Sequence, residues 1–148
     1  MADYYTVFSL VVDMSESEKH WIDRFLNLCE TLVDEDNYET IHVDYLESRS
    51  GNADHEAWFY SYGCEYSSVN ALSELLRRFL IKFDRDDVIS LEWANTCSKP
   101  RIDAFGGGAV VISRLGIDFI NTTAWSHEIS QRVGRRLTEE RKEGTRYT

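Results

Sequence analysis

Two segments with a helical spacing of apolar residues do most to limit what this chain can fold into. The first follows Ser15 and Glu18, which form a capping box, the serine–glutamate pair that satisfies free N–H groups at a helix start. Its apolar residues fall in two adjacent rows, namely Trp21, Phe25, Leu28 and Leu32, and Ile22, Leu26, Cys29 and Val33. The second segment, 68–83, has a stripe made of Val69, Leu72, Leu76, Phe79 and Phe83, with Leu75 and Leu80 beside it. Both patterns predict helices that cover a sheet.

Alternating apolar residues predict strands before, between and after these helices. Segments 4–12, 56–65 and 88–94 alternate clearly and are rich in β-branched and aromatic residues, whereas 40–47 alternates weakly and suggests an edge strand. The resulting order is βαββαβ. It pairs most simply as a ferredoxin-like sandwich, an antiparallel sheet with both helices on one face, so the predicted fold class is α+β.

A hairpin and a third helix extend this predicted sandwich. GAVVIS and GIDFINT read as two strands joined by a short turn at 114–116. The helix is expected to begin near Ser126. Its apolar face is made of Ile129, Val133 and Leu137. Its basic face is made of Arg132, Arg135 and Arg136. The length fits one domain, residues 1–140, followed by a polar tail, 141–148, that frays.

The stretch CSKPRIDAFGGGA, residues 97–109, is the candidate ligand site. It combines the only proline and two cations with a run of three glycines: Pro100, Lys99, Arg101, Gly106, Gly107 and Gly108. No P-loop or dinucleotide pattern is present, and the residues that follow read as a strand rather than a helix. Two main interpretations stay open, with catalysis as a minor third. The glycine N–H groups and the cations bind an anionic or nucleotide-like molecule, or the glycines permit a bulge or a close approach of strands.

Neither catalysis nor a metal centre has support in the sequence. Cys97 would need a neighbouring base to act as a nucleophile, and no histidine is close to it in the chain. The four histidines are scattered, and no HExxH or CxxC pattern occurs. We therefore expect no catalytic residue, no metal and no cofactor, and we favour a binding protein over an enzyme.

The cysteines and the apolar runs bear on location. Cys29, Cys64 and Cys97 are odd in number and widely spaced, which is typical of reduced thiols in a cytoplasmic protein. No apolar run approaches the ~20 residues that cross a bilayer. The opening MADYYTVFSL lacks the basic and long apolar regions of a secretion signal. We expect a cytoplasmic protein with no membrane partner.

Charge is unevenly distributed along the chain. Residues 1–95 carry 20 acidic and 7 basic residues, a balance of −13, whereas residues 96–148 carry 6 and 9, a balance of +3. An acidic body argues against direct nucleic-acid binding, because phosphate contacts supply most of that affinity. It suits a partner protein with a basic surface, although solubility alone also explains it.

Aromatic residues are dense in the segment 56–65. They are Trp58, Phe59, Tyr60 and Tyr62. One face of this strand must pack on helices, and core packing is the default explanation. The opposite face could be covered by a partner, by the third helix, or by a second copy in a homodimer. Base stacking is disfavoured by the acidic surroundings and by the missing basic–aromatic pattern of RNA-binding domains.

The motifs YYTVFS, CSKPRIDAFGGGA and NTTAW resemble a group of short proteins of bacteria, plasmids and phages that has no assigned activity. The resemblance spans most of residues 4–125 and implies an accessory protein of a phage or mobile element. Such proteins often block a host factor. Together with the acidic body, this gives the expected function: a non-enzymatic protein that inhibits or modulates a host factor, for example in anti-defence. The alternative is a binder that sequesters an anionic small molecule at residues 97–108.

Overall fold

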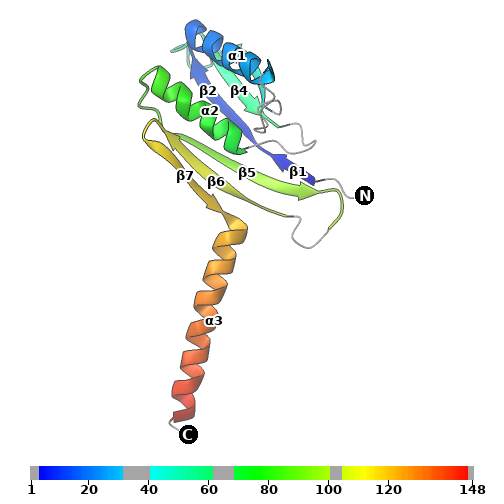
Figure 1. The fold of residues 1–148 in the computed structure, drawn as a ribbon, viewed down its shortest axis with the longest axis vertical. Coiled ribbons are helices and arrows are strands. Elements are labelled where there is room, and N and C mark those ends of the chain that lie inside the picture. The colour runs from blue at the N-terminus through cyan, green and yellow to red at the C-terminus, as the bar shows by residue number, and fades with distance from the viewer. Residues whose placement is uncertain (1–3, 32–40, 62–68, 101–104, 147–148) are drawn as a thin grey trace.

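The chain forms two antiparallel sheets and three helices in the residues that the computed structural model describes, which are 4–31, 41–61, 69–100 and 105–146 (Figure 1). The helices are α1 (Glu16–Thr31), α2 (Val69–Lys82) and α3 (Thr122–Arg146). The strands are β1 (Tyr4–Val7), β2 (Ser9–Met14), β3 (His42–Glu47), β4 (His55–Tyr60), β5 (Ile89–Cys97), β6 (Gly106–Ser113) and β7 (Gly116–Asn121). The predicted α+β class, the hairpin and the C-terminal helix are confirmed.

The strands are divided between two sheets rather than placed in the single sheet that the sequence suggested. One sheet has the order β1-β5-β6-β7 and the other has the order β2-β4-β3. Every neighbouring pair is antiparallel. The weakly alternating segment, β3, lies at an edge, as expected. β6 and β7 are joined by a two-residue turn between Ser113 and Gly116, which face each other in the ladder.

The predicted first strand is interrupted at Phe8. β1 pairs with β5 up to Val7, and β2 pairs with β4 from Ser9. Ser61 occupies the break: its N–H donates to the Phe8 carbonyl at 3.1 Å, and its hydroxyl donates to the Thr6 carbonyl at 2.5 Å. The Phe8 N–H donates to the same hydroxyl at 3.3 Å. One serine therefore satisfies the backbone groups that the change of partner would leave unpaired.

The core lies between the sheets and the pair α1 and α2. Phe8 and Val12 from the first strands, and Ile89 and Leu91 from β5, point into it, as their alternation predicted. The predicted stripe of α2 is buried except for Phe83, which lies just beyond the helix and is half-buried. In α1 the prediction was only partly right, because Ile22 is fully buried whereas Leu28 is 60% exposed. The side chain of Cys29 lies outside the described set.

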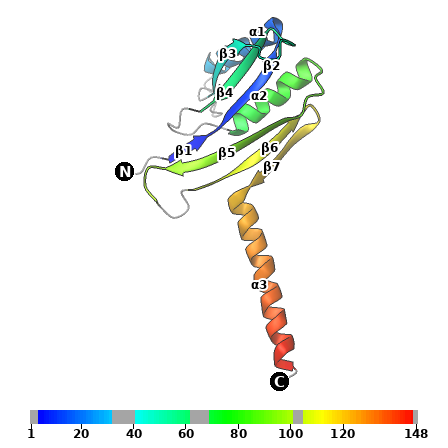
Figure 2. The same cartoon turned by 180° about the vertical axis from the view of Figure 1, so that it is seen from behind.

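Aromatic rings join the two covering helices. Trp21 stacks on Phe25 with ring centres 5.4 Å apart. It also meets Phe79 and Phe83, at 6.2 Å and 6.1 Å. Such offset and edge-on ring contacts add stability beyond the apolar area that they bury. The two helices thus form one layer on one side of the sheets, which Figure 1 and Figure 2 show from opposite sides.

The first and last helices, α1 and α3, each begin at a residue whose side chain caps the helix N-terminus. At α1 the predicted capping box is present: Ser15 N–H donates to Glu18 Oε1 at 2.8 Å, and Glu18 N–H donates to Ser15 Oγ at 3.3 Å. α3 begins four residues before the predicted Ser126, because Asn121 caps it. The Asn121 Oδ1 accepts N–H bonds from Thr123 and Ala124, at 2.9 and 3.2 Å.

α3 also continues to Arg146, beyond the domain end expected at residue 140. Among the described helices, none is both long enough and apolar enough to span a membrane.

Candidate binding surface

Both sheets turn one face toward α1 and α2 and leave the opposite face uncovered by any described helix (Figures 1 and 2). We call this uncovered side the open face. Side chains alternate between the faces of a strand, so neighbours of buried residues belong to it. Its larger apolar members include Val7, Val11, Leu46, Trp58, Tyr60, Val111 and Ile120. Val11 and Ile120 are 45% and 52% exposed, unusual values for large apolar strand residues.

Trp58 and Tyr60 form a fixed aromatic platform on this face. Their rings stack with centres 4.2 Å apart. The Trp58 indole donates to Ser9 Oγ at 2.8 Å, and the Tyr60 hydroxyl donates to Asp44 Oδ2 at 2.8 Å. Rings that are already held by hydrogen bonds lose little conformational freedom when a partner packs on them, which favours binding. The third ring of the set, Tyr62, lies outside the described residues.

The exposed charged residues on the strands of the open face are all acidic. Its exposed ionisable residues are Asp13, Asp44, Glu92 and Asp118. None of the seven described strands contains lysine or arginine. A fifth carboxylate, Glu56, is buried on the same side and pairs with Arg49. The Arg49 Nε lies 3.6 Å from Glu56 Oε2, and the Arg49 backbone N–H donates to Glu56 Oε1 at 2.9 Å, so one exposed guanidinium borders the open face. Apolar side chains bordered by carboxylates suit a partner that combines apolar and cationic groups.

The structure places the predicted ligand residues in different settings. Lys99 is exposed just after β5, and Arg101 lies outside the described residues. Gly106, Gly107 and Gly108 form the start of β6. The Gly107 N–H donates to Thr122 Oγ1 at 3.0 Å, so this group is already engaged within the protein. An anion site at Lys99 and Arg101 stays a prediction.

Tight packing accounts for the glycine run. A Cβ on Gly108 would lie 2.6 Å from two ring carbons of Trp93 and would also meet the Ile120 carbonyl oxygen. A Cβ on Gly107 would meet the Trp93 carbonyl oxygen, and the φ of Gly107, +159°, is one that residues with a side chain rarely adopt. β6 therefore passes between its neighbours at a distance that only glycine permits, which is the close approach considered from the sequence.

Cys97 ends β5 opposite Tyr4, is half-buried and makes no disulfide. Within the described part of the chain, no group of three or more His, Cys, Asp or Glu side chains is arranged to hold a metal ion.

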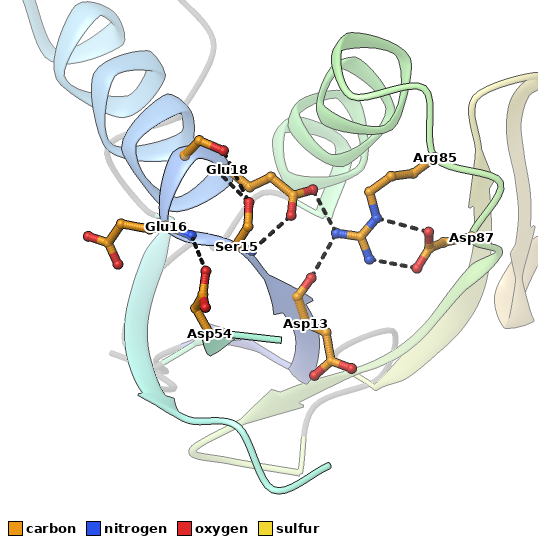
Figure 3. Close-up of polar contacts among 8 residues, drawn as sticks. Asp13, Ser15, Glu16, Glu18, Asp54, Arg85 and Asp87 are labelled. Carbon is orange, nitrogen blue, oxygen red and sulfur yellow. Dashed lines mark hydrogen bonds and ion pairs between the residues drawn. The ribbon is translucent and has the colours of Figure 1, made fainter. Parts of the chain in front are cut away.

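A cluster of polar contacts joins β2 and α1 to the segment after α2 (Figure 3). Arg85 donates to both Asp87 oxygens, at 2.9 and 2.7 Å, to Glu18 at 3.0 Å, and to the Asp13 carbonyl at 2.7 Å. These bonds raise the pKa of Arg85, chiefly through Asp87, and the Arg85 guanidinium lowers the pKa of Asp87. Each acceptor is matched by this one cation, so the cluster fastens the fold rather than forming an open site.

Two further polar contacts also serve the fold. Tyr45 donates to Asp23 at 2.7 Å, and burial together with this bond raises the pKa of Tyr45 well above its usual value. At the surface, a hydrogen bond from His55 lowers the pKa of Glu16.

No family model, curated protein or solved structure matches this chain. The open face is therefore interpreted from its own residues. Sequence reasoning had singled out its aromatic strand and its acidic surroundings. It did not show which carboxylates share the face, because the four come from four separate strands. Only the register of both sheets brings them together.

Proposed function

We propose that the protein is a non-enzymatic binding protein that holds a basic segment of another protein on its open face. The observation that carries the proposal is the composition of this face. A fixed aromatic platform and exposed valine and isoleucine side chains lie among carboxylates, with no cation on any described strand. Charge of one sign speeds association with an opposite partner, and the apolar groups supply affinity.

The partner that fits the acidic body and the sequence resemblance is a host factor with a basic surface. The protein would act as an accessory protein of a phage or mobile element that inhibits or modulates this factor, for example a component of defence or of nucleic-acid metabolism. A nucleic-acid-binding host protein presents such a basic surface, and an acidic protein can occupy it without binding nucleic acid itself.

A ferredoxin-like arrangement of residues 4–97 is part of the proposal. Phe8 lies between β1 and β2, and both strands keep the same alternation across it, with Val7 and Ser9 on the open face. If β1 and β2 are counted as one bent strand, the order becomes β5, then β1 with β2, then β4 and β3. This is the ferredoxin-like order, extended by β6 and β7. The hydrogen bond from Ser61 to the Phe8 carbonyl supports continuity at the bend.

Capture from a host lysate at low and moderate salt tests the function. The decisive variant is E92Q/D118N, which removes two charges from the open face. The matched control is D84N/D86N, which removes two exposed charges from the turn after α2. We expect the wild-type protein and the control to capture the same protein, E92Q/D118N to capture less, and capture to weaken as salt screens the charges. Equal capture by all three proteins would exclude the open face as the binding surface.

A further inference from the structure

α3 is a long helix that packs on almost nothing. It continues directly from β7, which ends at Asn121, and it leaves the body on the side opposite α1 and α2 (Figures 1 and 2). From Thr122 to Gly144 every side chain is exposed except Ile129, which is half-buried. Helices in proteins owe most of their stability to packing of an apolar face, and α3 lacks such packing within one chain.

The exposed side chains of α3 are not uniformly polar. Trp125, Ile129, Val133 and Leu137 recur every four residues and form one stripe, and the first, third and fourth are 54%, 47% and 56% exposed. Arg132 and Arg136 follow Ile129 and Val133 by three positions, so they border this stripe, with Arg135 beside them. Glu140 holds the same position after Leu137, and Arg132 pairs with Glu128 at 3.3 Å. α3 is therefore a basic amphipathic helix whose apolar stripe has no partner in the described chain.

The open face of the same molecule cannot take up this stripe. No linker separates Asn121 from Thr122, and the first turn of α3 is fastened to the hairpin. Asn121 caps it, and Thr122 Oγ1 accepts the Gly107 N–H. Folding α3 back over its own sheet would break these bonds and the helix start. The occupant must therefore come from another molecule.

The spacing and charge of α3 indicate that its apolar stripe packs on a sheet rather than on the α3 helix of a second copy. A two-helix coiled coil needs apolar residues alternately three and four positions apart, whereas this stripe advances by four each time and drifts around the helix. Residues 1–121 hold 22 acidic and 10 basic residues, a balance of −12, and α3 holds 4 and 6, a balance of +2. The acidic body also opposes approach to an anionic membrane.

We propose that α3 of one copy lies across the open face of a second copy, whose own α3 returns the contact. The apolar stripe of α3 meets Val11, Ile120 and the Trp58–Tyr60 platform, and its arginines meet the surrounding carboxylates. The exchange is symmetric, so it closes as a dimer.

With the full length of α3, the area of the reciprocal contact approaches that of a standard dimer interface. The 25 residues of α3 span about 37 Å and the helix is about 10 Å wide, so its footprint is about 370 Å². Each protomer contributes one helix and one face, which gives about 740 Å², near the about 800 Å² per partner of a standard interface. A single α3–α3 contact would provide about half of this area.

The dimer proposal rests on the proposed function only in that both use the open face. It names α3 of a second copy as one occupant of that face. The α3 helix of the second molecule would cover the open face until a basic partner protein displaces it. The two claims fail separately. A monomer that still captures a partner through Glu92 and Asp118 would overturn the dimer alone, and a dimer that captures nothing would overturn the function alone.

Sedimentation equilibrium of the full chain tests the dimer with three double variants. V133D/L137D alters the stripe of α3. V11D/I120D alters the open face. Q131D/T138D adds the same charges to the opposite side of α3, where both residues are exposed. We expect the wild-type protein and Q131D/T138D to dimerise. The other two variants should dimerise more than about a hundredfold more weakly, because each homodimer loses two buried apolar side chains in each of its two reciprocal contacts. Circular dichroism checks that each variant is folded.

A mixture of the two weakly dimerising variants gives the most specific test of the proposal. V133D/L137D retains an intact open face and V11D/I120D retains an intact α3, so the mixture recovers one of the two contacts and should form a heterodimer. A monomeric wild-type protein would overturn the proposal. Dimers lost only in V133D/L137D would also overturn it, in favour of an α3–α3 pair. So would a monomer whose α3 stripe binds vesicles of phosphatidylserine and phosphatidylcholine.

Discussion

Replacing Gly108 by alanine tests whether the glycine run of β6 serves packing. The new Cβ would lie 2.6 Å from two ring carbons of Trp93 and would press on the Ile120 carbonyl oxygen, a backbone atom of β7. Neither neighbour can move freely, because Trp93 packs against the core and Ile120 belongs to the β6–β7 ladder. Overpacking of this kind costs about 1–3 kcal/mol.

The alanine also restricts the unfolded chain, which offsets about 0.4–1 kcal/mol of that cost. With backbone on one side and a ring on the other, we expect a net loss of about 2 kcal/mol. For a chain of this size, such a loss lowers the Tm by about 4–8 °C.

Urea and thermal unfolding at equal protein concentration measure the effect. Gly116→Ala in the same hairpin is the control, because nothing lies within 4 Å of its added Cβ. The urea midpoint should fall for Gly108→Ala with an unchanged m-value, and Gly116→Ala should stay near the wild type. If both variants were equally stable, close packing would not explain the glycines, and the interpretation as an anion-binding loop would gain support.

Three further substitutions test the fold. Tyr45→Phe removes the 2.7 Å bond to Asp23 and should cost about 1 kcal/mol in chemical unfolding. Because the folded-state pKa of Tyr45 is raised, the wild type should also lose stability as the pH rises past its usual value of 10, and the variant should lose less. The pKa of Asp87 is lowered by Arg85, so its contribution is fully present above pH 3.8 and is lost as the pH falls through the lower folded value; Asp87→Asn should flatten this acid limb of the stability curve. Gly134→Ala meets no neighbouring atom and should raise the helical circular dichroism signal, stabilising α3 by up to about 1 kcal/mol.

Local patterns in the sequence predicted most of the elements. The capping box at Ser15, the stripe of α2 and the alternation of β5 each depend on residues close together in the chain, and each appears as expected. The start of α3 was misplaced because Asn121 reads as the end of a strand and is also a helix cap. The break at Phe8 had no local signal, because its cause is Ser61, far along the chain.

The open face could be predicted only in part. The sequence indicated that one side of the aromatic strand would lack helix cover. Its apolar and acidic members come from strands across both sheets, and their gathering depends on strand order and register. Lys99 and the glycines are neighbours in sequence and suggested a ligand loop. In the fold, the glycines lie against Trp93 and Ile120, and the Gly107 N–H donates to Thr122 Oγ1.

The dimerisation constant of D44N/E92Q/D118N tests most directly whether the acidic open face is a binding surface for a basic amphipathic helix. Sedimentation equilibrium of this variant and of the wild type, each at low and moderate salt, isolates the charge of the face and leaves its apolar groups intact. The account predicts a dimer at least about tenfold weaker than the wild type, with a smaller salt dependence, because each of the two reciprocal contacts loses three exposed charge pairs worth about 0.2 kcal/mol or more apiece. Equal dissociation constants and equal salt dependence for the two proteins would contradict it.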